Sequence, residues 1–177
     1  MTQSIALIVC IIFLPLIGHY RRWPPTRFFA FAALFYAIGG AINLASVEIA
    51  RNILQGPKPQ FHDTYYVVKP GYISLNHGVI MAAFAALTWL QTRLNAMLYP
   101  RITKALFWLL HLGLSASSSI ATGLTSFFTM PRRYVDYPEM ITRVNLIGQW
   151  GAIATIVATV CLFALFVWSF VARRSCQ

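Results

Sequence analysis

The feature of this sequence that most constrains its fold is a series of long apolar runs separated by polar, proline-containing segments. Five such runs are present, at residues 4–17, 28–50, 70–90, 102–130 and 145–171. A helix crosses the bilayer core with roughly 20 apolar residues, and every run except the first, which contains Pro15, reaches that length. Helices also satisfy their own backbone hydrogen bonds in lipid. We therefore predict an all-α fold, a polytopic membrane helical bundle of about five transmembrane helices, with residues 1–177 forming a single membrane domain.

The composition supports a membrane protein and argues against a nucleic-acid-binding protein. Hydrophobic residues make up 58% of the chain and charged residues 10%, whereas about a quarter of the residues in soluble domains are charged. Basic residues outnumber acidic ones by 14 to 4, but they gather between the apolar runs, where membrane anchors and topology signals are found. The expected partner is the lipid bilayer. No basic segment precedes the first run and no cleavage site follows it, so we expect a retained helix.

The polar connectors give a prediction for the orientation in the membrane. Two longer connectors, residues 51–69 and 131–144, lie on one side of a five-helix arrangement. The opposite side carries eight basic residues and the connector side carries six. Cytoplasmic loops carry the excess of lysine and arginine. We therefore expect both connectors on the non-cytoplasmic side of a bacterial inner membrane or its organelle equivalent.

Two motifs within these connectors resemble a known family. His62–Val68 reads HDTYYVV, and Met130–Pro138 reads MPRRYVDYP. In the same order, they resemble the segments H-D-T-Y-[FY]-V-V and M-P-R-R-Y-x-D-Y-P-D of subunit I of haem-copper respiratory oxidases (cytochrome c oxidase subunit I). Phe35–Gly40 is similar to the family's helix before the first motif. The resemblance covers about Phe28 to Trp168 and implies the C-terminal third or so of a twelve-helix fold.

The resemblance implies roles for two pairs of polar residues. His62 and Asp63 match the family's ligands to a magnesium ion, which prefers carboxylate oxygen and retains several waters. Arg132 and Arg133 match an arginine pair that donates hydrogen bonds to haem propionates, a task suited to the planar guanidinium group. From the chemistry alone, the arginine pair could equally bind lipid phosphate or Asp136.

The sequence departs from the family directly after the first motif. There the family has A-H-F-H, whose two histidines ligate the haem irons, and this chain has Lys69-Pro70-Gly71-Tyr72. Pro70 and Tyr72 therefore stand at the two histidine positions. Proline offers no ligand atom, and tyrosine rarely ligates haem iron. We do not expect this chain alone to reduce oxygen, and whether it is an enzyme stays open.

Two histidines lie within the apolar runs and are candidates for a relocated haem site. His77 is seven residues after Pro70 and faces nearly the same direction. His111 begins a polar stripe on one helix face, formed by Ser115, Ser118, Thr122, Thr125 and Thr129. Ionisable residues inside a membrane commonly mark functional sites. One interpretation is a b-type haem with His77 and His111 as axial ligands; the other is polar packing between helices.

The depth of the two histidines bears on these interpretations. Counting residues from the helix ends places His77 about 10 Å and His111 about 18 Å below the outer face of a 30 Å core. That offset argues against one haem ligated by both residues unless the haem is steeply inclined. A pair of His77 residues across a homodimer is another geometry. We expect the helices to pack through small residues such as Gly39 and Gly40 and those of the fourth run.

Three functions are compatible with these observations. The first is a non-catalytic accessory or assembly component of a respiratory complex. The second is a membrane electron carrier that binds one haem through His77 and/or His111. The third is a component of an active haem-copper oxidase that works with partner chains, and the missing iron ligands argue against it. The cofactors concerned are haem and magnesium, and the expected partners are other respiratory subunits or a second copy of the chain.

Overall fold

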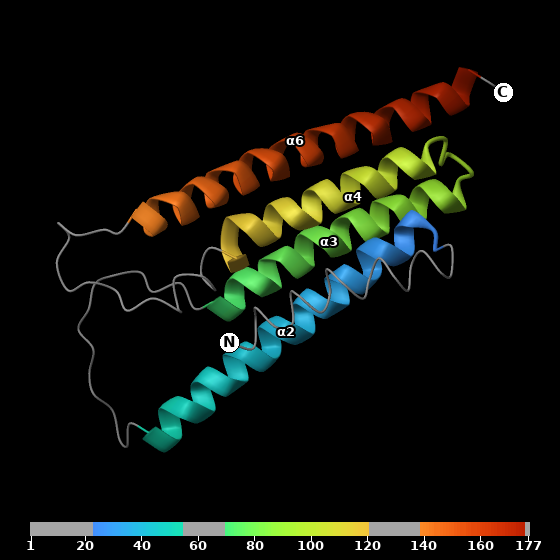
Figure 1. Ribbon diagram of the computed structural model, residues 1–177. Coiled ribbons are helices and arrows are strands. Elements are labelled where there is room, and N and C mark those ends of the chain that lie inside the picture. The colour runs from blue at the N-terminus through green and yellow to red at the C-terminus, as the bar shows by residue number, and fades with distance from the viewer. Residues whose placement is uncertain (1–22, 55–69, 121–138, 176–177) are drawn as a thin grey trace.

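The computed structural model describes residues 23–54, 70–120 and 139–175. Within these ranges the chain is helical, with no strand. The elements are α2 (Pro25–Leu54), α3 (Pro70–Arg93), α4 (Pro100–Leu114), the π-helix η1 (Ser115–Ile120) and α6 (Glu139–Ser175). Figure 1 shows these helices lying side by side, with successive helices running in opposite directions. The predicted all-α fold is therefore confirmed for the described residues.

Three helices are long and apolar enough to cross a membrane, over Pro25–Ala45, Tyr72–Arg93 and Asn145–Ala172. They correspond to the second, third and fifth predicted runs. The fourth run is divided: α4 has 15 residues and continues into η1, which ends at Ile120. The predicted helix at 4–17 and the last segment of the fourth run lie outside the described residues.

The ends of the predicted connectors differ from the structure. The connector predicted at 51–69 begins later, because α2 continues to Leu54. The connector predicted at 131–144 ends earlier, because α6 begins at Glu139, directly after Pro138. A charged residue is compatible with a helix that extends into the membrane surface, so charges mark the edge of the apolar core and not the end of the helix.

Proline defines where several of the helices begin. Pro25, Pro70 and Pro100 are each the first residue of a helix, a position where the missing N–H costs no hydrogen bond. Between α3 and α4 the chain reverses in a short turn in which Asn95 adopts a left-handed conformation, with φ of 50°. The backbone N–H of Ala96 donates to the carbonyl of Gln91 across this turn, at 2.8 Å. The turn places α4 antiparallel to α3.

Aromatic side chains from α2, α3 and α4 form the core. The rings of Phe29 and Phe107 meet edge to face, with centroids 4.9 Å apart. Phe28 also contacts Phe107 at 5.6 Å, and Phe84 contacts Phe29 at 5.7 Å. Phe29 and Phe107 are completely buried. Since lipid is as apolar as these side chains, close packing stabilises such a core more than exclusion from water does.

Glycine allows the closest approach between helices. A Cβ atom on Gly113 of α4 would lie 2.7 Å from Thr155 Oγ1 and 2.9 Å from the Gly151 carbonyl oxygen of α6. In α3, a Cβ on Gly78 would lie 3.3 Å from the Ala33 carbonyl oxygen of α2. The expectation for Gly39 was wrong, because a Cβ there would meet no described atom within 4 Å. The bundle thus consists of two close pairs, α2 with α3 and α4 with α6.

Both motif segments connect to the same end of the bundle. The end of α2 and the start of α3 flank residues 55–69, while the end of η1 and the start of α6 flank residues 121–138. All four helix ends lie at the left end of the bundle in Figure 1, with the end of α2 set apart from the other three. The α3–α4 turn, the start of α2 and the end of α6 lie at the opposite end.

Candidate functional site

A tyrosine and two histidines from three different helices meet in the interior of the bundle. The ring of Tyr36, on α2, contacts the imidazole of His77, on α3, with centroids 5.4 Å apart. The same ring contacts the imidazole of His111, on α4, at 5.6 Å. All three side chains are buried, with exposed fractions of 3%, 7% and 0% respectively. Tyr36 therefore links the two helix pairs at the level of the histidines.

Hydrogen bonds join Tyr36 to α4 at the point where this helix changes its geometry. The phenol oxygen of Tyr36 lies 3.2 Å from Nδ1 of His111 and 3.1 Å from Oγ of Ser115. Ser115 in turn donates to the backbone carbonyl of His111 at 2.7 Å. Ser115 is also the first residue of η1. Short π-helical segments occur frequently at functional sites, and here one begins at a residue of the polar cluster.

The imidazole of His111 is held on its sides by aromatic rings. Phe107 stacks on it with an interplanar angle of 10° and a centroid distance of 5.6 Å. Trp108 meets it edge to face at 5.9 Å. Its Nε2 atom is buried and has no hydrogen-bond partner within residues 23–54, 70–120 and 139–175. A buried polar atom without such a partner calls for a functional or structural explanation.

The structure brings together the candidates inside the apolar runs. His77, His111 and Ser115 share one cluster, because each of them contacts Tyr36. Tyr36 was missed as a site residue. A phenol in the middle of an apolar run was the available signal, since its hydroxyl needs a partner in the membrane.

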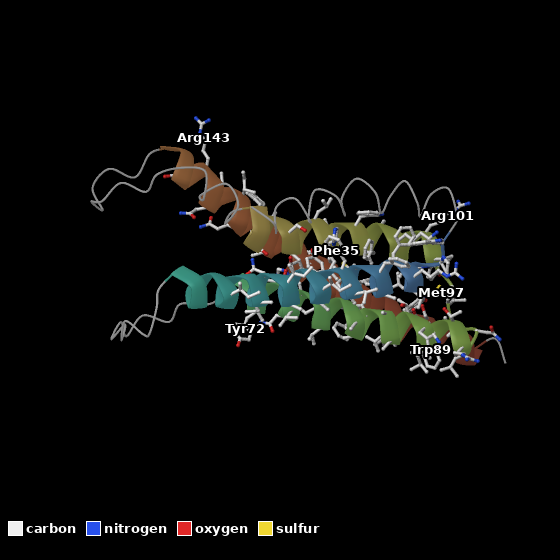
Figure 2. The ribbon with its side chains drawn as sticks, turned by 90° about the horizontal axis from the view of Figure 1, so that it is seen from below. Phe35, Tyr72, Trp89, Met97, Arg101 and Arg143 are labelled. Atoms are coloured by element: carbon white, nitrogen blue, oxygen red, sulfur yellow. The ribbon has the colours of Figure 1, made fainter. Side chains whose placement is uncertain are left out.

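The candidate residues of the two motifs are not part of this cluster of described side chains. His62, Asp63, Arg132 and Arg133 lie outside the described residues. Of the two residues that stand at the family's iron ligands, Pro70 is the first residue of α3. Tyr72 has 53% of its surface exposed and points away from the neighbouring helices in Figure 2. Its phenol is therefore not directed toward the interior of the bundle.

These features define a polytopic α-helical membrane protein with a polar site buried between its helices. Residues 4–160 match the family described as cytochrome c and quinol oxidase polypeptide I. Since this match covers most of the chain, the protein belongs to that family. No solved structure matches the chain.

Individual relatives agree with this assignment. Cytochrome c oxidase subunit 1 of Albinaria turrita is 33% identical over 142 residues, which cover 79% of this chain and 69% of that protein. The Eremothecium gossypii protein of the same name is 29% identical over 152 residues, covering 85% of this chain and 27% of the relative. The Cereibacter sphaeroides protein is 31% identical over 97 residues, or 52% of this chain and 16% of the relative. The chain thus spans only a portion of these proteins.

The family implies a haem cofactor. Among the described residues, the two that stand at the family's iron ligands do not suit haem iron, and one buried histidine does. Pro70 and the outward-facing Tyr72 do not fit as iron ligands. The imidazole of His111 does fit, because its buried Nε2 is a nitrogen of the type that ligates haem iron. For a metal ion without a porphyrin, no group of three or more histidine, cysteine, aspartate or glutamate side chains occurs within the described ranges.

Proposed function

We propose that this protein is a non-catalytic, subunit-I-like component of a respiratory membrane complex, with an accessory or assembly role. One observation carries the proposal. At the two positions where the family has its iron-ligating histidines, this chain has a proline that begins α3 and a tyrosine whose side chain points outward. A partner chain can supply missing helices but cannot easily supply ligands that belong to α3 itself.

The two motifs are the proposed contact with that complex. Their flanking helix ends lie at one end of the bundle, which supports a common surface formed by residues 55–69 and 121–138. On this surface, His62 and Asp63 would bind a divalent cation such as magnesium. Arg132 and Arg133 would bind carboxylates or phosphates of a neighbouring subunit, cofactor or lipid. We propose that the surface faces away from the cytoplasm.

Affinity purification from native membranes tests this role. We expect the tagged protein, extracted in a mild detergent, to co-purify with haem-copper oxidase subunits identified by mass spectrometry. Arg132→Gln combined with Arg133→Gln should reduce this recovery. Arg101→Gln is the matched control, because Arg101 is exposed at the opposite end of the bundle (Figure 2). Recovery of the chain only as a homo-oligomer would contradict the proposal.

A second function is favoured by a separate observation, the convergence of His77 and His111 on Tyr36. We propose as the alternative that the bundle binds one b-type haem through His111, His77 or both, and carries electrons within the membrane. When bound, the haem would supply one-electron redox chemistry. The chain would contribute imidazole nitrogen as the iron ligand and a membrane interior that excludes water.

The optical spectrum of the purified protein tests this alternative. After expression with sufficient haem, we expect a Soret band and a stoichiometric pyridine haemochrome in detergent-purified protein. A protein without a Soret band under these conditions would rule out the haem-binding function. This outcome would leave the proposed accessory role unaffected, since that role rests on Pro70 and Tyr72.

A further inference from the structure

The hydrogen bonds around Tyr36 determine which atoms can carry protons. Ser115 Oγ lies 2.7 Å from the carbonyl oxygen of His111, the shortest contact in the cluster. A carbonyl oxygen only accepts, so the single hydroxyl proton of Ser115 must point toward it. Ser115 Oγ can then take part in its contact with Tyr36, at 3.1 Å, only as an acceptor.

The proton of Tyr36 is fixed by the same reasoning. The phenol also has a single hydroxyl proton, and it donates that proton to Ser115. The phenol oxygen also lies 3.2 Å from Nδ1 of His111. In this contact the phenol oxygen can only accept, and Nδ1 must therefore be the donor. All three bonds form together only when Nδ1 of His111 carries a proton.

The position of this proton decides the state of the other ring nitrogen. A doubly protonated ring would place a positive charge at a fully buried position, which is costly without a paired anion. The neutral ring that carries its proton on Nδ1 has an unprotonated Nε2 with an available electron pair. Nε2 is also the buried atom of His111 that has no hydrogen-bond partner among the described residues.

We propose that Tyr36 and Ser115 are positioning residues that hold His111 as the Nδ1–H tautomer, so that Nε2 is the nitrogen that ligates a haem iron. The ligand is identified on the basis of the haem-binding alternative above. A metal-ligating histidine commonly donates its second N–H to a neighbouring acceptor, which fixes the tautomer and the ring orientation. Tyr36 is this acceptor, Ser115 orients Tyr36, and Phe107 holds the ring plane from one face.

The tautomer can be measured without haem. In protein labelled with ¹⁵N-histidine, two-bond ¹H–¹⁵N correlations distinguish a proton on Nδ1 from one on Nε2. The chain has four histidines, so the signals of His111 are assigned by their loss in His111→Gln. We expect the Nδ1–H pattern for His111 in the wild type. A wild-type Nε2–H pattern would overturn the proposal.

Ser115→Ala is the most discriminating variant. It removes the acceptor of the Tyr36 proton but leaves the phenol beside His111. The phenol should then donate to Nδ1, and the imidazole proton should move to Nε2. The matched control is Ser169→Ala, because Ser169 is also fully buried and donates to a carbonyl four residues earlier, that of Leu165, at 2.8 Å. The control should keep the wild-type pattern, and an unchanged pattern in Ser115→Ala would contradict the proposal.

Haem binding provides the second measurement. We expect Ser115→Ala and Tyr36→Phe to lower haem affinity by about tenfold or more, as for other residues that orient a metal ligand, with Ser169→Ala unchanged. Equal affinities in all variants would overturn the positioning role. If Tyr36→Phe does not fold, Ser115→Ala still decides the outcome. A wild type that shows the Nδ1–H pattern but binds no haem would refute the proposed bond between His111 and haem iron. It would also refute the haem-binding function. The tautomer assignment would stand.

Discussion

The phenol oxygen of Tyr36 lies 3.2 Å from Nδ1 of His111, although the two residues are 75 positions apart in the chain. The contact joins α2 to α4 and therefore joins one close helix pair to the other. A hydrogen bond between membrane helices contributes about 0.6 kcal/mol on average. Four buried polar side chains from three helices, those of Tyr36, His77, His111 and Ser115, gather at this contact.

The close approach of α4 and α6 predicts a strong effect of added methyl groups. Gly113→Ala and Gly151→Ala should each lower the free energy of unfolding by about 1 to 3 kcal/mol, because the new Cβ would overlap backbone atoms that cannot easily move. For Gly151 the nearest atom, Ser117 N, would lie at 2.6 Å. Gly39→Ala is the control with open space and should be neutral or slightly stabilising. Unfolding in mixed micelles followed by circular dichroism measures this, and equal effects at all three sites would refute the close approach.

Phe107 is the aromatic residue on which the core most depends. Its ring contacts Phe28, Phe29, Trp108 and His111. We expect Phe107→Ala to lower the free energy of unfolding by about 3 kcal/mol, the lower end of the usual range, because lipid is as apolar as the core. The same measurement on Leu112→Ala, whose side chain is 45% exposed, should show a change below about 1 kcal/mol. Comparable losses in both variants would contradict the packing of Phe107 in the core.

Removal of each buried histidine separates their contributions to haem binding. If the bundle binds haem, His111→Ala should abolish the Soret band or move it, because the ligating nitrogen is lost. His77→Ala should change the spectrum only if His77 is the second axial ligand. Leu112→Ala serves again as the control, next to His111 but exposed. An unchanged spectrum in either histidine variant would exclude that residue as an iron ligand.

The first motif gives a prediction about a bound ion. His62→Ala together with Asp63→Ala should remove a stoichiometric divalent cation from protein purified in the presence of magnesium, because a hard cation depends on carboxylate oxygen. Inductively coupled plasma mass spectrometry measures the metal content per chain. Gln60→Ala, two residues before the pair, should retain the ion. Retention of the ion by the double variant would refute the assignment of these two ligands.

The membrane helices could be predicted from the sequence, but their exact ends could not. Length and apolar composition were sufficient to locate α2, α3 and α6, because a bilayer imposes both requirements on a single segment. The boundaries were placed at the first charged residues. Helix α2, however, includes Arg27 and Arg51, and α6 includes Arg143. Long basic side chains reach the membrane surface from within a helix, so they do not terminate it.

The candidate site was only partly predictable, for a related reason. Periodicity places residues on a face of their own helix but does not say which other helix lies against that face. His77 and His111 could be recognised singly, as ionisable residues in apolar runs. Their meeting at Tyr36 depends on α2 contacting both α3 and α4, which no single-helix pattern contains. The same gap explains the wrong expectation for Gly39 and the missed role of Gly151.

The arrangement in two glycine-packed pairs has a mechanical consequence. Within each pair glycine lets the backbones approach closely, so we expect the two helices of a pair to move together. Between the pairs the contacts include the side chains of Tyr36, His111, Phe29 and Phe107. A group that enters beside His111 would therefore have to separate one pair from the other at these side-chain contacts.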